Sequence, residues 1–221
     1  MVSIDFVNNA NMLGTLVCFR KTPIGTCTVR QLEDVRWLLI DNTLQSVSDL
    51  TQPQQFLLPH LQQLASLWQT LPEPSNILEV GLGGGAIRNY LNASYPHCNI
   101  TTIEKSQDII ELYTQYFASL PQSNLIAGDI TTYHFSNSYN WIVLDLFSKQ
   151  DCPIFLFQHE FYQRVKSLFV DDANRHLFIN FICESAQQLN SLRTILTSVF
   201  KADVTIYAIK DYNNKIVHLH F

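Results

Sequence analysis

Glycine residues, charged residues and closely spaced pairs of cysteines are all scarce in this chain of 221 residues. It has seven glycines, 15% charged residues and a formal net charge of −5, with no long basic cluster. A basic surface for nucleic acid or for an anionic membrane is therefore not indicated. The five cysteines are odd in number and form no C-x-x-C pair, which argues against a disulfide framework or a zinc site. We expect reduced thiols in the core.

Long hydrophobic runs are also absent. No apolar run approaches the ~18 residues of a membrane span, and residues 1–5 lack a basic region followed by an apolar one. His218 and His220 share one face of an expected terminal strand, but two imidazoles without a third ligand do not indicate a metal. These absences favour a soluble, cytoplasmic protein with no metal. A hydrophobic content of 47% is enough for a sizeable core.

The order of the elements indicates an α/β fold in two parts. Residues 13–40 read as short strands separated by turns, which predicts a small antiparallel β domain at 1–52. The spacing of apolar residues over 54–69 predicts a helix. This helix opens a predicted Rossmann-like domain at 53–221, in which strands and helices then alternate. Its last two strands are separated by a short turn and should form an antiparallel hairpin after the parallel strands. The predicted strands are 76–80, 99–104, 123–127, 140–144, 176–182, 203–209 and 216–220, and the predicted helices are 86–94, 106–119, 153–169 and 185–200.

Four of the seven glycines stand together at positions 81, 83, 84 and 85, between a predicted strand and a predicted helix. Gly81, Gly83 and Ala86 satisfy G-x-G-x-x-A, the dinucleotide pattern in which a pyrophosphate sits at the helix N-terminus. Glu104, at the end of the second strand, is placed to accept hydrogen bonds from ribose hydroxyls. A nicotinamide cofactor and an adenosyl-sulfonium cofactor are both compatible with these features.

Glu79 separates the two cofactors. It begins the run Glu79-x-Gly81-x-Gly83-x-Gly85 and places a carboxylate beside the glycines. A carboxylate there would repel a pyrophosphate, whereas it would attract the ammonium and sulfonium groups of an adenosyl sulfonium. The terminal hairpin also favours this cofactor, because a dinucleotide-binding sheet would continue with another crossover. A glycine turn needed only for strand–helix packing is the alternative.

Two more acids follow strands of the predicted sheet. Asp129 lies in Gly128-Asp129-Ile130 after the third strand, and Asp145 ends the fourth. Each alone could simply cap a turn. Because ligands of open α/β sheets bind at the carboxyl ends of the strands, we expect these acids to gather there with Glu79 and Glu104.

The chain resembles the spermidine synthase (polyamine aminopropyltransferase) family, whose nucleotide domain has the class I methyltransferase fold. The segment Ile40-Asp41-Asn42-Thr43-Leu44-Gln45 is similar to the family's L-D-G-x-x-Q. The glycine run, Glu104, Gly128-Asp129 and Asp145 follow in the family's order. Residues 153–162, PIFLFQHEFY, are similar to its P-x-x-L-F-x-x-x-F-Y segment. The resemblance covers roughly residues 35–221.

This resemblance implies a role for each matching residue. Gln45 would contact the thioether end of the cofactor, with Gly81, Gly83 and Gly85 in the turn around it. Glu104 would hold the ribose, and Asp129 with Ile130 the adenine. Asp145 would be the base that takes a proton from an attacking amine. The implied cofactor is S-adenosylmethionine or its decarboxylated form, with methylthioadenosine as product. Because members of the family are usually oligomeric, the resemblance also implies a homodimer.

The positions at which the family binds its diamine substrate differ in this chain. Ser148 replaces the second acid of the family's D-S-S-D-P motif. The family has further diamine-binding acidic residues in the segment before the helix. Counting back from His60, the corresponding positions in this chain hold Leu50, Thr51, Gln54, Gln55 and Phe56. We therefore expect alkyl transfer from a sulfonium to an amine that is not putrescine. The alternatives are methyl transfer from S-adenosylmethionine and a non-catalytic nucleotide-binding protein.

Overall fold

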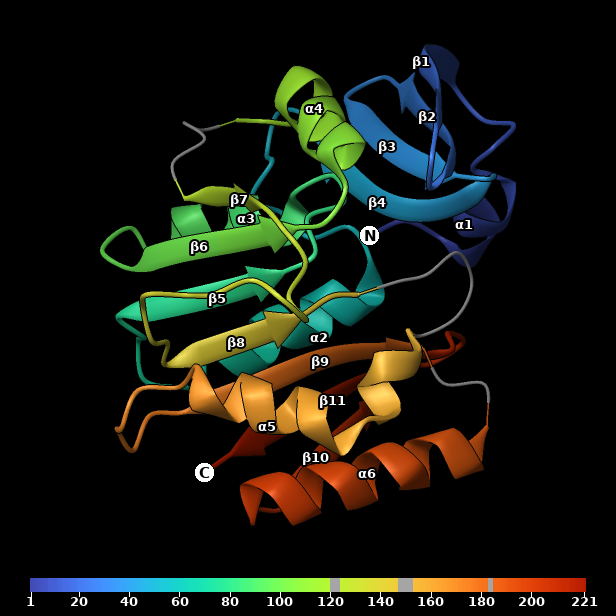
Figure 1. Cartoon of the computed structure of the whole chain (residues 1–221). Coiled ribbons are helices and arrows are strands. Elements are labelled where there is room, and N and C mark those ends of the chain that lie inside the picture. Colours follow the sequence, from blue (N-terminus) through green and yellow to red (C-terminus); the bar gives the residue numbers. More distant parts are fainter. Residues whose placement is uncertain (120–123, 147–152, 183–184) are drawn as a thin grey trace.

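The protein has two sheets with helices packed against them (Figure 1). The computed structural model describes residues 1–119, 124–146, 153–182 and 185–221. A four-stranded sheet is built from the N-terminal segment, and a seven-stranded sheet from the rest. The expected fold class is confirmed: a mostly parallel Rossmann-like sheet accompanied by a small antiparallel one.

The small sheet follows a short helix, α1 (Ile4–Asn9). Its strands lie in the order of the sequence, and each pairs antiparallel with the next. Asp41 and Asn42 join the last two strands with φ values of 46° and 66°, a left-handed conformation that suits a two-residue hairpin. Neither α1 nor the fourth strand was predicted. The strands are β1 (Thr15–Thr22), β2 (Gly25–Leu32), β3 (Val35–Ile40) and β4 (Thr43–Asp49).

The large sheet has the order β10-β11-β9-β8-β5-β6-β7. The five strands from β9 to β7 are parallel, and β11 runs antiparallel between β9 and β10, which confirms the terminal hairpin. The bounds of β5, β6 and β9 agree with prediction and the others differ by one or two residues, with Ser123 outside the described part. The strands are β5 (Asn76–Val80), β6 (Asn99–Glu104), β7 (Leu125–Ala127), β8 (Trp141–Leu144), β9 (His176–Ile182), β10 (Val204–Ala208) and β11 (Asn214–His220).

Two of the predicted helices are corrected. The helix expected from residue 54 begins at Pro59, because proline without an N–H is favoured in the first helical turn. The single helix expected over 153–169 is two pieces, since Gln158 is extended with φ −108° and ψ 130°. Phe155 packs on Phe161 across this break. The helices are α2 (Pro59–Trp68), α3 (Ala86–Ser94), α4 (Gln107–Tyr116), the 3-10 helix η1 (Ile154–Phe157), α5 (His159–Ser167) and α6 (Ala186–Phe200).

Side chains of β5 alternate between the two faces of the large sheet. Leu78 and Val80 join a core with residues of α5 and α6. Ile77 faces the other side, in a core with residues of α2 and α3. Trp37 of the small sheet is buried in that second core, so the small sheet packs directly onto the domain built around the large sheet.

The three described cysteines, Cys18, Cys27 and Cys98, are free thiols, and Cys27 is buried. Cys152 and Cys183 lie outside the described residues. Within the described ranges, no helix combines the length and apolar character that crossing a membrane requires.

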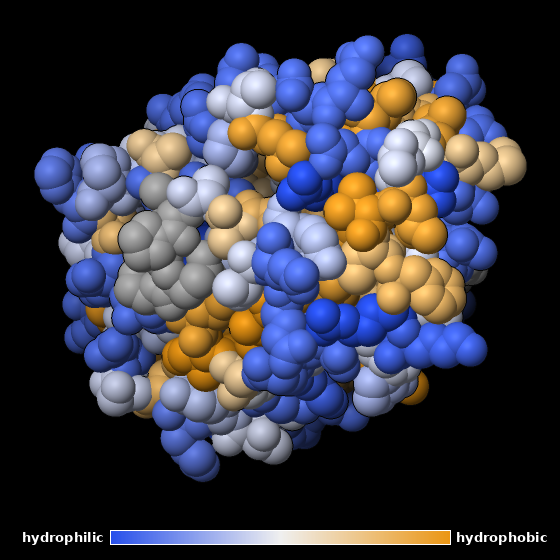
Figure 2. Space-filling view, turned by 90° about the horizontal axis from the view of Figure 1, so that it is seen from above, coloured by the Kyte–Doolittle hydropathy of each residue, from blue (hydrophilic) through white to orange (hydrophobic). Residues whose placement is uncertain are grey.

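The outer strand of the small sheet carries exposed apolar side chains. Seen from above, hydrophobic surface gathers over the part of the molecule where this sheet lies (Figure 2). Leu16, Val17 and Phe19 of β1 are all exposed, and β1 is an edge strand. An apolar edge of this kind is typical of a surface that another chain covers.

Candidate active site

A cavity of about 710 Å³ lies at the carboxyl ends of β5, β6, β7 and β8, beneath the small sheet. This is where an open α/β sheet binds its ligand. Its wall brings together seven of the nine predicted site residues: Gln45, Gly81, Gly83, Glu104, Asp129, Ile130 and Asp145. Glu79 and Gly85 are not part of the wall.

The glycine turn approaches its neighbours closely. Gly81, with φ 94°, lies against β8, where an added Cβ would come within 2.1 Å of the carbonyl oxygen of Asp145. Gly85, with φ 70°, caps α3, and an added Cβ would meet the Tyr113 ring at 2.0 Å. Gly83 is different, because an added Cβ would meet only Ser46, at 3.8 Å. Gly81 and Gly85 thus serve packing, and Gly83 faces the open cavity.

Glu79 lies inside the protein rather than in the cavity, which corrects its predicted position beside a bound cofactor. It is 1% exposed on the side of β5 that faces α3. The Thr102 hydroxyl donates to its Oε2 at 2.5 Å and accepts from Arg88 Nη1 at 2.7 Å. Burial raises the pKa of Glu79 to about 8, against the opposing effects of Thr102 and Arg88. The choice of sulfonium over pyrophosphate therefore rests on the terminal hairpin and not on this carboxylate.

Glu104 holds two loops at the cavity wall. Its carboxylate accepts from the backbone N–H of Leu82 at 3.0 Å and from that of Ser106 at 2.8 Å. Burial raises the pKa of Glu104, and these backbone hydrogen bonds oppose the rise. The side chain therefore ties the glycine turn to the start of α4 while remaining part of the cavity wall.

Asp129 is a second acidic residue of the cavity wall. Its Oδ2 pairs with Lys105 Nζ at 2.9 Å, and its Oδ1 accepts from the Thr131 backbone N–H at 2.8 Å. Burial acts to raise the pKa of Asp129, but Lys105 and Thr131 outweigh it and lower the pKa below its ordinary value. This carboxylate is therefore ionised at neutral pH and already has a cation beside it.

Asp145 stands directly after β8 and is partly buried. Its Oδ1 accepts a hydrogen bond from Asn180 Nδ2 at 2.8 Å, and Asn180 in turn accepts from Asn214 Nδ2 at 3.0 Å. Burial raises the pKa of Asp145 to about 6, the Asn180 hydrogen bond opposes that rise, and the Glu104 carboxylate adds to it. At neutral pH, Asp145 is thus an ionised carboxylate that can readily take up a proton.

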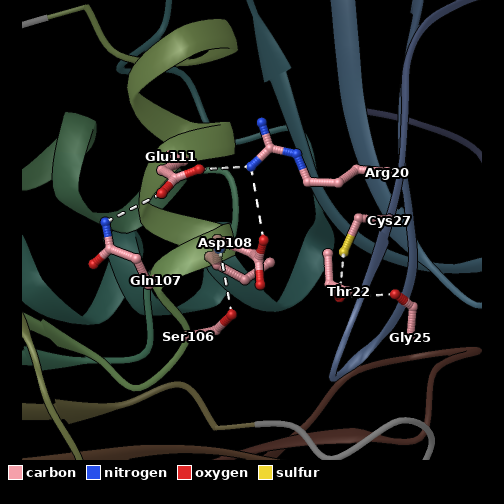
Figure 3. Close-up of polar contacts among 9 residues, drawn as sticks. Arg20, Thr22, Gly25, Cys27, Ser106, Gln107, Asp108 and Glu111 are labelled. Atoms are coloured by element: carbon pink, nitrogen blue, oxygen red, sulfur yellow. Dashed lines mark hydrogen bonds and ion pairs between the residues drawn. The ribbon is translucent and has the colours of Figure 1, made fainter.

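Polar contacts join β1 of the small sheet to α4 (Figure 3). Arg20 Nη1 lies 2.9 Å from Glu111 Oε2 and 3.8 Å from Asp108 Oδ1, and Asp108 is part of the cavity wall. In the adjoining turn, the Thr22 hydroxyl donates to the carbonyl of Gly25 at 2.7 Å. The small sheet therefore forms part of the site and is not merely an appendage to it.

Comparison with known proteins agrees with this geometry. A curated relative, the polyamine aminopropyltransferase of Vibrio vulnificus (strain CMCP6), is 30% identical over 104 residues. That match spans 44% of this chain and 35% of the relative. The crystal structure of a probable spermidine synthase from Corynebacterium glutamicum superposes with a TM-score of 0.74 at 16% identity, covering 94% of this chain and 80% of that one. The chain is thus similar to an aminopropyltransferase over part of its sequence, and to a probable spermidine synthase in its fold.

The spermidine synthase-like fold is shared with methyltransferases. Human methyltransferase-like protein 13, solved in complex with S-adenosylhomocysteine (SAH), superposes with a TM-score of 0.63 at 21% identity. That superposition covers 74% of this chain and 82% of the human chain. No family model matches the chain. The predicted resemblance is confirmed, and the structural likeness establishes the fold alone.

The structure also corrects the expectation about the positions of the diamine-binding acids. The five positions counted back from His60 do not line the cavity. Phe56 is instead buried in the core, stacked on Tyr90 at 4.5 Å between ring centroids, and Thr51 bonds Asp49. Ser148 lies outside the described residues. These positions were counted back from His60 along residues 50–58, a segment with no helix or strand, where counting does not tell which side chains face the cavity.

Three residues of the site were missed by sequence reasoning. Asn180 and Asn214 support Asp145 from β9 and β11, and His60 in the first turn of α2 lines the cavity. Asn180 could have been noticed in the sequence, because it is a polar residue within the apolar run of β9. His60 follows Pro59 at a helix start, which alone does not distinguish a site from a surface residue.

Proposed function

We propose that this protein is a transferase that moves an alkyl group from an adenosyl sulfonium to an amine. The observation that carries the proposal is the position and environment of the Asp145 carboxylate. Its carboxylate shares one cavity with Glu104 and Asp129, is held by Asn180 and has a pKa raised to about 6. A base of this kind is what an amine nucleophile needs, because an ammonium has no lone pair.

The acidic residues of the cavity wall support an adenosyl cofactor. By resemblance to the spermidine synthases, Glu104 would accept from the ribose hydroxyls and Asp129 from the adenine amine. The SAH in human methyltransferase-like protein 13 is a ligand of the same chemical kind. S-adenosylmethionine and decarboxylated S-adenosylmethionine both fit this proposal, with Gln45 near the sulfur.

The proposed reaction is a single displacement. The amine lone pair attacks the carbon next to the sulfonium, so that an N–C bond forms as the C–S bond breaks. The bonding electrons pass to sulfur, which leaves as a neutral thioether, and the amine proton passes to Asp145. The partly buried carboxylate also stabilises the positive charge that develops on nitrogen.

Methyl transfer from S-adenosylmethionine is the second candidate, favoured by the likeness to a methyltransferase fold with SAH bound. A non-catalytic nucleotide-binding protein is the third. The released thioether distinguishes the first two, since aminopropyl transfer yields methylthioadenosine and methyl transfer yields SAH.

The experiment supplies purified protein with either sulfonium and a panel of amines, and detects the released thioether by chromatography. Asp145→Asn should lower turnover about 100-fold or more, the usual contribution of a general base. Asp171→Asn, at an exposed acid after α5, is the matched control and should leave turnover unchanged. Thermal shift with methylthioadenosine then shows whether Asp145→Asn still binds nucleotide. Release of neither thioether, with binding intact, would leave the non-catalytic alternative.

A homodimer and a cytoplasmic location remain predictions of the sequence. The exposed apolar side chains of β1 are the surface through which we expect the dimer to form.

A further inference from the structure

Two adjacent strands of the large sheet end at the cavity with one basic and one acidic residue. β6 ends at Glu104 and continues into Lys105, while Asp129 stands two residues after the end of β7. The two strands are parallel, with Glu104 opposite Ala127, and the backbone N–H of Gly128 donates to the Glu104 carbonyl at 2.9 Å. Lys105 and Asp129 are therefore neighbours, and both are part of the cavity wall.

The Asp129 carboxylate keeps one acceptor position for a ligand. Its Oδ1 accepts from the backbone N–H of Thr131 at 2.8 Å and from the Thr131 hydroxyl at 2.7 Å, which together use both lone pairs of that oxygen. Its Oδ2 pairs with Lys105 Nζ at 2.9 Å, and this contact uses one of its two lone pairs. The Asp129 side chain is 28% exposed and lines the cavity, so a ligand there can contact it.

Lys105 brings hydrogen-bond donors to the same place. Its ammonium has three N–H groups, and the ion pair with Asp129 occupies one of them. The Lys105 side chain is 79% exposed, so the other N–H groups can be reached by a ligand. The two residues thus present a donor and an acceptor side by side to whatever binds at the ends of β6 and β7.

Adenine carries the complementary pair of groups. Along one edge of the base, its N6 amine donates and the neighbouring N7 accepts, whereas a 6-oxo purine presents two acceptors there. In the proposed function Glu104 holds the ribose, so the base of the same nucleoside would lie toward the next strand, β7. That is where Lys105 and Asp129 meet.

We propose that Lys105 is a specificity-determining residue of the nucleotide site, which donates a hydrogen bond to N7 of the adenine while Asp129 accepts from the N6 amine. This inference rests on the adenosyl cofactor proposed above and adds a second residue that recognises its base. The ion pair stays intact in this arrangement, because Lys105 uses a further N–H group and Asp129 uses its remaining lone pair. Recognition of the base therefore requires no separation of the two charges.

Calorimetry with methylthioadenosine and its 7-deaza analogue, in which a C–H replaces N7, tests the contact without depending on turnover. The wild-type protein should bind methylthioadenosine about three- to tenfold more tightly than the 7-deaza analogue, the typical worth of one hydrogen bond. Lys105→Met should remove this preference, and Lys105→Arg, which keeps a donor, should retain part of it. Lys210→Met, at an exposed lysine after β10, is the control and should retain all of it. The melting temperature shows that each variant is folded.

The 1-deaza analogue tests which ring nitrogen is involved. It keeps N7, so Lys105→Met should weaken its binding by the same factor as that of methylthioadenosine. SAH and its deaza analogues replace the methylthioadenosine series if the wild-type protein binds SAH more tightly.

The outcomes separate this inference from the function on which it rests. A lysine that only holds the two loops together would weaken both nucleosides equally when replaced, so a preference that persists in Lys105→Met overturns the contact. Equal binding of methylthioadenosine and its 7-deaza analogue by the wild-type protein overturns it too. A preference over the 1-deaza analogue that disappears in Lys105→Met overturns the assignment to N7. In all three cases the adenosyl cofactor still stands, whereas failure to bind either methylthioadenosine or SAH overturns the cofactor itself.

Discussion

Asn180 shows how one buried amide sets the properties of the site. It is 1% exposed in β9, donates to Asp145 and accepts from Asn214, so that both ends of its amide are satisfied. Because the hydrogen bond goes to the ionised form of Asp145, it favours that form. Asn180 is therefore a positioning residue that keeps the pKa of Asp145 from rising further.

At the residue scale, we predict that Asn180→Leu moves the acidic limb of the pH–rate profile to higher pH. Activity requires ionised Asp145, so wild-type kcat/KM should fall as pH drops through about 6, the pKa of Asp145. Without the hydrogen bond this pKa rises by about one unit, so the loss should be about tenfold at pH 5, about twofold at pH 7 and negligible at higher pH. The measurement is kcat/KM from pH 5 to 9. Asn214→Leu, one contact further from Asp145, should shift the limb less, and an unshifted limb in Asn180→Leu would contradict the assigned role.

Three histidines stack along the paired strands β9 and β11. His176 Nδ1 lies 2.9 Å from His218 Nε2, and the His176 and His220 rings stack at 4.5 Å between centroids. Across the described residues no cluster of potential ligands suits a metal ion. Burial lowers the pKa of both His176 and His218 to about 4, and the neighbouring imidazoles add to this. The stack is thus stable while its inner rings are neutral.

At the element scale, we predict that the protein loses stability as pH falls from about 6.5 to about 4. The unfolded histidines bind protons below their ordinary pKa of about 6.5, whereas His176 and His218 in the folded state resist protonation down to about 4. The unfolded state therefore binds more protons across this window, and the free energy of unfolding decreases there.

Urea denaturation at pH 7 and pH 5 measures this effect. His218→Phe keeps the stacking on Phe178 and removes one titrating ring, so it should reduce the loss between the two pH values. Some dependence should remain, because His60 shifts in the same direction. His97→Phe is the exposed control, and equal losses in both variants would argue against the stack as the cause.

Both sheets share one core at the scale of the whole molecule. Trp37 of β3 is fully buried, donates from Nε1 to the carbonyl of Ala10 at 2.8 Å, and packs edge-on to Phe6. It belongs to the same cluster as Leu61 of α2 and Trp141 of β8. The boundary predicted at residue 52 therefore separates two sheets whose side chains pack together.

We predict that the molecule unfolds as one cooperative unit and that Trp37→Ala destabilises all of it. Removing a fully buried tryptophan typically costs about 3–5 kcal/mol. Far-ultraviolet circular dichroism, which reports both sheets, should show a single transition that coincides with near-ultraviolet signals of the aromatic core. Arg20→Met, which removes only a partly exposed ion pair between β1 and α4, should cost less than about 1 kcal/mol. Two separate transitions would mean that the small sheet unfolds independently.

Elements of the fold could be predicted where short-range signals define them. The bounds of β5, α3, β6 and β9 agree with prediction because apolar runs, the glycine turn and flanking polar residues mark their ends. The two-piece 153–169 segment could not, since the packing of Phe155 on Phe161 accompanies the break. The late start of α2 was a missed local signal, because Pro59 is favoured in the first helical turn.

The sequence by itself determined the Rossmann-like sheet with its terminal hairpin, and placed Glu104, Asp129 and Asp145 at the ends of neighbouring strands. Only the tertiary structure decided which side chains face the cavity. Glu79 is turned inward by Thr102 on the adjoining strand, while Asn214, distant along the chain, completes the support of Asp145 through Asn180. Strand-end position follows from local patterns, whereas the direction and partner of a polar side chain depend on which distant segments pack beside it.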